Sequence, residues 1–390
     1  MHSNRLLGGL SPSEFLDQHW QKRPLLLRQA LPAFRTPLTP DELAGLACEA
    51  DVESRIVLER DGHQPWCLLQ GPFDEARFAS LPETHWTLLV QECNRYVPEL
   101  AALLDRFDFI PGWRVDDVMV SYAPTEGSVG PHVDQYDVFL LQGLGRRRWQ
   151  ISTRPVAEDN LIPDLDLRIM RNFQATDEWV LEPGDMLYLP PGVAHYGVAL
   201  EDCMTFSVGF RSPTLAEMIT AYVDEAVTRL TEYDRYHDPD LCLQAHPGEI
   251  TAGARQRVRD CLRALLADDA TLDQWFGRFV TEAKSPQRGP LTPPLLEPLA
   301  LRAAIEHAGG LQRSEEVRFA FIRDGADLTL FVDGNAYPVG RHAAPAAMRL
   351  CDRRQLQSDD LALDNDAWLA LLSELYTSGY VELLAESEAP

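Results

Sequence analysis

The chain has 390 residues, of which 45% are hydrophobic, and its formal net charge at pH 7 is −25. This length allows two or three globular domains with sizeable cores, and so acidic a surface disfavours binding to nucleic acid or to anionic membranes. The charge serves either solubility or the attraction of a basic partner, and composition leaves both interpretations open.

The sequence shows no membrane span, signal peptide or disulfide pattern. The sequence contains no apolar run of about 18 residues that could span a membrane, and the first twenty residues lack the apolar segment and cleavage site of a signal peptide. Seven cysteines are scattered without a CxxC pair, which is not the pattern of a disulfide framework or a zinc finger. We therefore expect a reducing, cytoplasmic location and no membrane association.

The chain begins with mixed elements. The stretch "SPSEFLDQHW" (11–20) opens with Ser-x-x-Glu, which predicts a helix, and "KRPLLLRQAL" predicts a short strand. From about residue 115 to 212, seven short β-rich runs are separated by Gly, Pro and Asp. This texture predicts an all-β sandwich or barrel.

After residue 213 the pattern becomes helical. Apolar residues recur at three- and four-residue spacing at Ile219, Tyr222, Val223, Ala226, Val227 and Leu230, which predicts a helix with one apolar face. Two further helical runs continue to about residue 285. Such a face would be buried either by packing on the β domain or by pairing with a second copy of the chain.

The last hundred residues follow a proline-rich linker. Residues 285–298 contain five prolines, and the tail from 299 contains a helix, the hairpin signal "FAFIRDGADLTLFVDGNAYPVG" and two more helical runs. Helices with a hairpin fit a winged-helix-like module. Residues 291–390 contain 8 Arg and no Lys against 16 acidic residues, a net −8, so we expect a scaffold module without direct DNA binding.

A candidate metal site lies in "GPHVDQYDVFLLQGLGRRRWQIS" (130–152). His132 and Asp134 are two residues apart, so a strand presents them on one face. His195, in the later β run "EPGDMLYLPPGVAHYGVAL", supplies a third candidate ligand. Two His and one carboxylate form the facial triad of non-heme Fe(II) oxygenases, which leaves coordination positions open. Each residue alone is more often an ordinary polar residue; their combination favours the metal.

Arg147 is the second unusual feature of this stretch. In "RRRWQIS" it shares a strand face with Trp149 and Ile151, which predicts a cation inside the β domain, and buried Arg is rare unless paired. A dicarboxylic co-substrate such as 2-oxoglutarate would pair with it; the alternative is a structural salt bridge. Ser121 either adds a hydroxyl to the same carboxylate or is a neutral core residue.

At these residues the chain resembles a known family. "GPHVDQYDVFLLQG", "GRRRW", "LEPGDMLYLPPGVAHYG" and "SVGFRSP" look like the Jumonji-C ribosomal oxygenases, specifically the bacterial ribosomal protein arginine hydroxylases. The early "FLDQHWQKRPLLLR" and the late "WFGRF" and "SGY" fit as well, so the resemblance covers nearly the whole chain.

The resemblance implies an α+β fold whose core is a double-stranded β-helix of the jelly-roll, cupin-like, Jumonji-C type. It implies an oxygenase domain over 1–213 with its β-helix core at about 95–213 and with N-terminal helices, a helical dimerisation region over 214–285 and a winged-helix-like domain over 286–390. A homodimer follows from it.

The resemblance also implies the chemistry. Fe(II), 2-oxoglutarate and dioxygen would hydroxylate the β-carbon of an arginine in a basic partner, the large-subunit ribosomal protein L-sixteen. Its iron ligands match His132, Asp134 and His195, its co-substrate carboxylate binder matches Arg147, and Ser121 falls in the co-substrate region.

Two alternatives remain open. A Jumonji-C lysine demethylase would use the same triad on methylated peptides. A non-enzymatic, cupin-like regulator would combine a β-barrel sensor with the winged helix. Cupin barrels more often use several His and a Glu, so HxD…H with an interior Arg favours the oxygenase.

Overall fold

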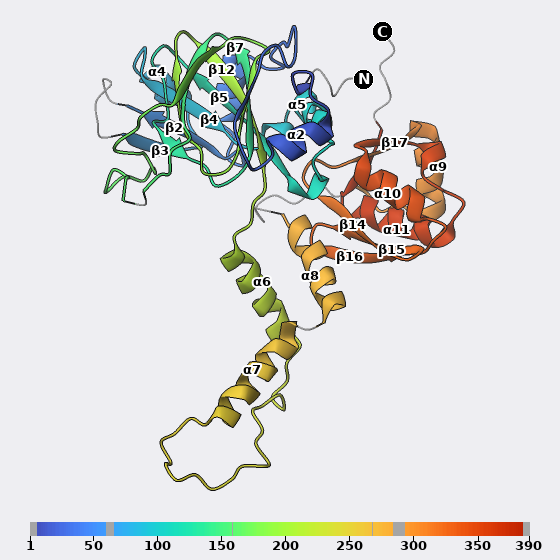
Figure 1. Ribbon diagram of the computed structural model, residues 1–390. Coiled ribbons are helices and arrows are strands. Elements are labelled where there is room, and N and C mark those ends of the chain that lie inside the picture. The colour runs from blue at the N-terminus through green and yellow to red at the C-terminus, as the bar shows by residue number, and fades with distance from the viewer. Residues whose placement is uncertain (1–5, 60–65, 158, 267, 284–292, 385–390) are drawn as a thin grey trace. The chain divides into compact units, whose positions relative to one another are not determined.

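The computed structural model describes the chain except residues 1–5, 60–65, 158, 267, 284–292 and 385–390. The chain divides into two compact units, Met1–Ser212 and Pro213–Pro390. Figure 1 shows the first unit in blue to yellow-green and the second in yellow-green to red.

Short helices surround the strands of the first unit. They are α2 (Pro12–Gln18), α3 (Pro40–Leu46), α4 (Glu75–Ala79) and α5 (Pro98–Leu104), with 3₁₀ turns at Cys93–Arg95, Asp105–Phe107 and Gly112–Arg114. Helix α2 begins with a capping box in which Ser11 and Glu14 bond each other's backbone, which satisfies two N–H groups that the helix leaves unpaired. The helix predicted at 11–20 is therefore confirmed.

Two antiparallel sheets form the body of this unit. The strands are β1 (Leu25–Leu27), β2 (Ser54–Leu58), β3 (Cys67–Gln70), β4 (Trp86–Val90), β5 (Val115–Ala123), β6 (His132–Val133), β7 (Val138–Leu144), β8 (Arg147–Ser152), β9 (Asp177–Leu181), β10 (Met186–Leu189), β11 (Ala194–Ala199) and β12 (Cys203–Phe210). The larger sheet has the order β1-β10-β7-β12-β5-β4-β2-β3 and the smaller has β6-β11-β8-β9. The seven predicted β runs are β5 and β7 to β12. The strand expected to carry His132 and Asp134 is the two-residue β6, which ends directly before Asp134.

The alternation of side chains along β7 separates two hydrophobic cores. Phe139 and Leu141 belong to the large cluster that includes α2, where the Phe139 and Tyr188 rings lie 4.8 Å apart. Val138 and Leu140 point to the opposite face and join Trp149 of the smaller sheet. The helices therefore cover one face of the larger sheet, and the smaller sheet covers the other.

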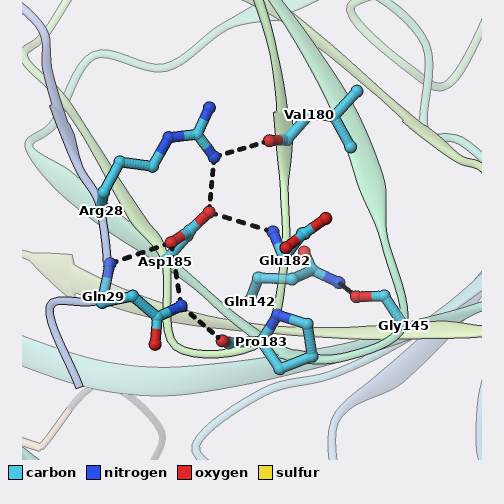
Figure 2. Close-up of polar contacts among 8 residues, drawn as sticks. All are labelled: Arg28, Gln29, Gln142, Gly145, Val180, Glu182, Pro183 and Asp185. Carbon is cyan, nitrogen blue, oxygen red and sulfur yellow. Dashed lines mark hydrogen bonds and ion pairs between the residues drawn. The ribbon is translucent and has the colours of Figure 1, made fainter. Parts of the chain in front are cut away.

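A buried carboxylate joins β1 to the turn between β9 and β10 (Figure 2). Asp185 is ion-paired with the Arg28 guanidinium at 2.5 Å and accepts hydrogen bonds from the backbone N–H of Gln29 at 2.9 Å and of Glu182 at 3.2 Å. Burial opposes ionisation of this carboxyl, but these donors outweigh burial and hold the pKa of Asp185 below its ordinary value. The network fixes the turn that leads into β10.

The second unit combines helices with two small sheets. Its helices are α6 (Leu215–Thr228), α7 (Ala252–Leu266), α8 (Asp269–Thr281), α9 (Pro298–Ala308), α10 (Ala344–Asp352) and α11 (Asp366–Thr377). Its strands are β13 (Gly310–Arg313), β14 (Phe319–Asp324), β15 (Asp327–Val332), β16 (Asn335–Val339), β17 (Gln355–Gln357) and β18 (Val381–Leu383), in the sheets β17-β13-β18 and β14-β15-β16. The predicted hairpin is the three-stranded meander β14–β16.

The apolar face predicted for α6 is divided in the structure. Tyr222 and Ala226 are buried against Trp275 of α8, whereas Ile219, Val223 and Val227 are 62%, 46% and 56% exposed. Helix α8 packs in turn on β15, where a Cβ at Gly277 would lie 2.4 Å from the Phe331 ring. Part of the face is thus covered by the chain itself and part is not.

The proline-rich linker lies partly outside the described residues, because 284–292 are not described and Pro298 already begins α9. The division of the second unit at residue 285 stays a prediction. Among the described residues, no helix is both long and apolar enough to cross a membrane.

We predict that Asp185→Asn lowers the free energy of unfolding by about 1–3 kcal/mol at pH 7, because it removes a charged acceptor from four donors, the Gln29 side-chain amide included. The folded-state pKa of Asp185 is depressed, so its contribution is complete above the unfolded-state value near ~3.9 and is lost as the pH falls below it. Denaturant titrations at pH 7, at about pH 5, at about pH 3.5 and at about pH 2.5 should show that the difference in the free energy of unfolding between wild type and variant is constant down to about pH 5 and narrows at the two lowest values. A difference that stays constant at every pH would contradict the assignment.

Candidate metal centre

The two histidines predicted as ligands are direct neighbours across two strands. His195 on β11 pairs in register with His132 on β6, and the two rings lie 4.2 Å apart. Asp134 follows β6, with its Oδ2 3.9 Å from Nε2 of His132 and 3.6 Å from Nε2 of His195. One ligand atom from each residue lies within 4.8 Å of the others, so the structure brings the three predicted residues together.

Backbone carbonyls fix the orientation of both imidazoles. Nδ1 of His132 lies 2.9 Å from the carbonyl oxygen of Gly130, and Nδ1 of His195 lies 3.1 Å from that of Val193. A carbonyl oxygen only accepts, so each Nδ1 donates, and in the neutral form of the ring this leaves the Nε2 lone pair available to a metal ion. Such carbonyl partners are typical of metal-bound histidines. Gly130 adopts a φ of +79°, which a side chain would strain.

The electrostatics keep His195 neutral. Its side chain is 3% exposed, and burial, followed by the repulsion of His132, lowers its pKa to about 4. A neutral imidazole is the form that binds a metal ion. The side chains of His132 and Asp134 are about a quarter exposed, so the centre is closed on the His195 side and accessible on the other.

Arg147 lies on the interior face of β8, as predicted. It pairs with Ala199, whereas Ile151 pairs with His195. Arg147 therefore lies four positions along β8 from the residue opposite His195, which corresponds to about 13 Å of strand. Arg147 is 3% exposed. Within the described part of the chain, its Nε and Nη2 are buried and have no hydrogen-bond partner. A structural salt bridge through these two atoms is therefore not observed there.

Ser121 lies on the opposite wall, in the larger sheet. It is 4% exposed and pairs with Thr205 of β12, which in turn pairs with Gln142 of β7. Thr205 donates to the Gln142 side chain at 3.2 Å, whereas the Ser121 hydroxyl is 3.5 Å from its acceptor, the Thr205 carbonyl. That distance is at the limit of a hydrogen bond, so this hydroxyl has a weak partner.

Several carboxylates act on Tyr136, which lies two residues after Asp134 in the chain. Burial raises the pKa of the Tyr136 phenol, and the charges of Asp134, Asp117 and Asp116 raise it further, while Arg55 opposes them. Asp116 and Asp117 therefore act on the same tyrosine as Asp134, the carboxylate predicted as a ligand. A cationic group would be attracted to this region.

Sequence reasoning missed two features of this interior. The Trp149 indole N–H is buried and has no partner among the described residues, although the residue was placed on the correct face. Gly197 lies opposite Trp149 on β11. The available signal was a glycine inside a strand, which often marks a close approach of another group.

The residues present fit a metal ion with a dicarboxylate. Two imidazoles and one carboxylate are the donor set of the facial triad. A buried guanidinium whose Nε and Nη2 have no partner within the described ranges fits a carboxylate ligand.

Comparisons with known proteins agree with this geometry. The family model described as "JmjC domain" matches residues 102–218, and the model described as "ROXA-like winged helix" matches residues 264–382. The first range includes the triad and Arg147.

Several relatives match most of the chain. The ribosomal protein uL16 3-hydroxylase of Escherichia coli K12 is 38% identical over 370 residues, which cover 94% of this chain and 96% of the relative. A probable ribosomal oxygenase of Haemophilus influenzae is 36% identical over 77% of this chain and 76% of its own. The E. coli YcfD crystal structure superposes with a TM-score of 0.87 at 36% identity, covering 96% and 98% of the two chains. YcfD in complex with cobalt and 2-oxoglutarate gives 0.83 over the same shares, also at 36% identity.

We predict that the protein binds one Fe(II) or Co(II) ion per chain and that His195→Ala or Asp134→Ala weakens binding at least a hundredfold, because each removes one of three protein ligands. Metal content after dialysis, measured by atomic emission, checks this. His237→Ala is the matched control, since His237 is exposed and lies outside the triad. Retention of metal by both ligand variants would rule out the centre.

Proposed function

The chain belongs to the JmjC-domain ribosomal oxygenases, and from this we propose that it is an Fe(II)- and 2-oxoglutarate-dependent dioxygenase of a ribosomal protein. Its proposed substrate is uL16, the protein named for the E. coli relative. The proposed product carries a hydroxyl on the β-carbon of one arginine side chain.

Each site residue has a distinct role in this proposal. His132, Asp134 and His195 hold Fe(II), Arg147 holds the distal carboxylate of 2-oxoglutarate, and Ser121 adds a hydroxyl to the same region. Fe(II) with 2-oxoglutarate supplies the activation of dioxygen that an unactivated C–H bond requires. The chain's own contribution is to orient the ligands, keep His195 neutral and exclude water from the interior.

The observation that carries the proposal is the buried guanidinium of Arg147 in the same interior as the triad, because its Nε and Nη2 have no hydrogen-bond partner among the described residues. A cation in such a place costs several kcal/mol unless an anion joins it. A co-substrate with a carboxylate at one end and a metal-chelating group at the other meets both requirements.

Electrostatics support a basic substrate. The chain has a net charge of −25, and Asp116 and Asp117 add negative potential near Tyr136, beside the metal ligand Asp134. A basic ribosomal protein would be steered toward such a surface, and its arginine would meet carboxylates at the open side of the centre.

The alternatives are not favoured. Relatives named as bifunctional lysine-specific demethylases and histidyl-hydroxylases match less of the chain, for example 30% of it in Brugia malayi. The triad with an interior Arg147 argues for an oxygenase rather than a cupin-like regulator. The acidic tail argues against direct DNA binding.

The remaining assignments complete the proposal. Residues 1–213 form the oxygenase domain, 214–285 a dimerisation region and 286–390 a winged-helix-like domain of a cytoplasmic homodimer. The uncovered part of the α6 face, at Ile219, Val223 and Val227, supports the homodimer, because a second copy would remove it from water.

We predict that the protein, Fe(II) and 2-oxoglutarate together add one oxygen atom to uL16 on a single arginine. Mass spectrometry of large-subunit proteins checks this, with peptide fragmentation to place the atom. His132→Ala, which lacks a metal ligand, should give no addition. Oxygen gain that persists in this variant would refute the proposal.

We predict that the wild-type protein has a mass near twice 43.9 kDa in solution and that Val223→Asp with Val227→Asp gives the single-chain mass. Two carboxylates in an apolar interface leave uncompensated charge. Multi-angle light scattering measures the mass. Thr220→Asp is the matched control on the same helix, since Thr220 is already exposed and polar. A monomeric wild type would disprove the homodimer.

A further inference from the structure

We propose that Trp149 is a co-substrate-binding residue, which supports the Arg147 guanidinium with its ring face and donates its indole N–H to the carboxylate that Arg147 holds. This inference rests on the proposed function, because it names a second contact to the same dicarboxylate. It also assigns a role to Gly197, which leaves the space that the ring occupies.

The register of the smaller sheet places Trp149 between the two ends of the site. On the interior face of β8, Ile151 pairs with His195, Trp149 with Gly197 and Arg147 with Ala199. The Trp149 ring lies 5.9 Å from the His195 ring, and the Arg147 guanidinium carbon lies 5.7 Å from the Trp149 ring centre. A ligand that reaches from the metal centre to Arg147 must therefore pass Trp149.

Gly197 determines how the indole lies. A Cβ at this position would be 2.7 Å from Cη2 and Cζ3 and 2.9 Å from Cε3 of Trp149. These atoms form the edge of the indole farthest from the nitrogen, so the benzene ring lies over Gly197 and Nε1 lies on the opposite edge. Real Cβ atoms do not approach so closely, and any side chain at 197 would displace the ring.

The indole nitrogen lacks the partner that a buried donor requires. Trp149 is 4% exposed, and its Nε1 has no hydrogen-bond partner in the part of the chain that the structure describes. Buried Trp nitrogens usually have one, because an unmade hydrogen bond is costly. Arg147, stacked on the same ring, also has two buried donors, Nε and Nη2, for which the described residues supply no partner. One carboxylate could accept from both side chains.

An apolar core role alone does not account for these observations. Trp149 does pack with Val138 and Leu140, but a phenylalanine would fill that role without a buried N–H. Trp179 on β9 offers a direct comparison, since it pairs in register with Trp149 and packs against the same cluster. Its Nε1 is not among the buried donors without a partner.

The test measures binding rather than turnover. Isothermal titration calorimetry of 2-oxoglutarate into the full-length, Mn(II)-loaded protein gives a Kd for the wild type and for Trp149→Phe, Gly197→Ala, Arg147→Ala and Trp179→Phe. We expect Trp149→Phe to raise the Kd about tenfold, as the loss of a hydrogen bond to a charged group does. Trp179→Phe, the matched control, should leave the Kd unchanged.

Two additional measurements locate the effect. Succinate keeps the distal carboxylate and lacks the 2-oxo group, so Trp149→Phe should weaken succinate and 2-oxoglutarate by the same factor. Gly197→Ala should also weaken both, because the methyl group displaces the ring. The double variant Trp149→Phe/Gly197→Ala should bind like Trp149→Phe alone, since both changes act through one contact.

The outcomes distinguish this inference from the function on which it rests. An unchanged Kd in Trp149→Phe, with binding lost in Arg147→Ala, overturns the role of Trp149 and leaves the oxygenase proposal intact. Equal losses in Trp149→Phe and Trp179→Phe would indicate a general packing effect and would also overturn it. Absence of 2-oxoglutarate binding by the metal-loaded wild type would refute the proposed function, and this inference with it.

Discussion

The burial of one guanidinium inside a β-sandwich is the constraint on which the first unit depends. Arg147 carries a permanent charge, and its stacking on Trp149 leaves Nε and Nη2 without an acceptor among the described residues. The surroundings match this requirement, because Gly197 and Ala199 are small and the facing wall carries polar Ser121. At the other end, burial keeps His195 uncharged. The interior thus has a neutral end at His195 and a cationic end at Arg147.

The two-residue period of β-strands places core residues on one face of the larger sheet and the residues that line the candidate site on the other. Alternate residues of β7 and β12 join the aromatic core under the N-terminal helix α2, where Phe139 and Phe206 are fully buried. The residues between them, such as Gln142 and Thr205, bond each other on the interior face. The turn held by Asp185 fixes the start of β10, which borders β7. Substitutions on the aromatic face therefore change the packing of the core, whereas substitutions at Gln142 or Thr205 change the polar contacts of the interior face.

Much of this arrangement could be predicted from local sequence. The β runs follow from alternation and turn residues, His132 and Asp134 from their spacing, and the interior position of Arg147 from its alternation with Trp149. Contacts that depend on distant partners could not be predicted. The α6 periodicity does not indicate that Tyr222 and Ala226 meet Trp275 while Val223 stays exposed, and nothing local to Gly277 predicts the Phe331 ring beside it. Strand β6 is too short for any periodic signal.

The cross-strand pairing of His132 with His195 has a thermodynamic consequence. Strand β6 has only two residues and borders a single strand, β11, so little backbone pairing holds this sheet edge. An ion held jointly by His132 and His195 would act as a staple between residues 63 positions apart in sequence, closing a loop that otherwise carries conformational entropy. A ligand that binds only the folded state stabilises it in proportion to the logarithm of its concentration. The concentration of the metal ion would therefore determine the stability of this sheet edge as well as the activity of the centre.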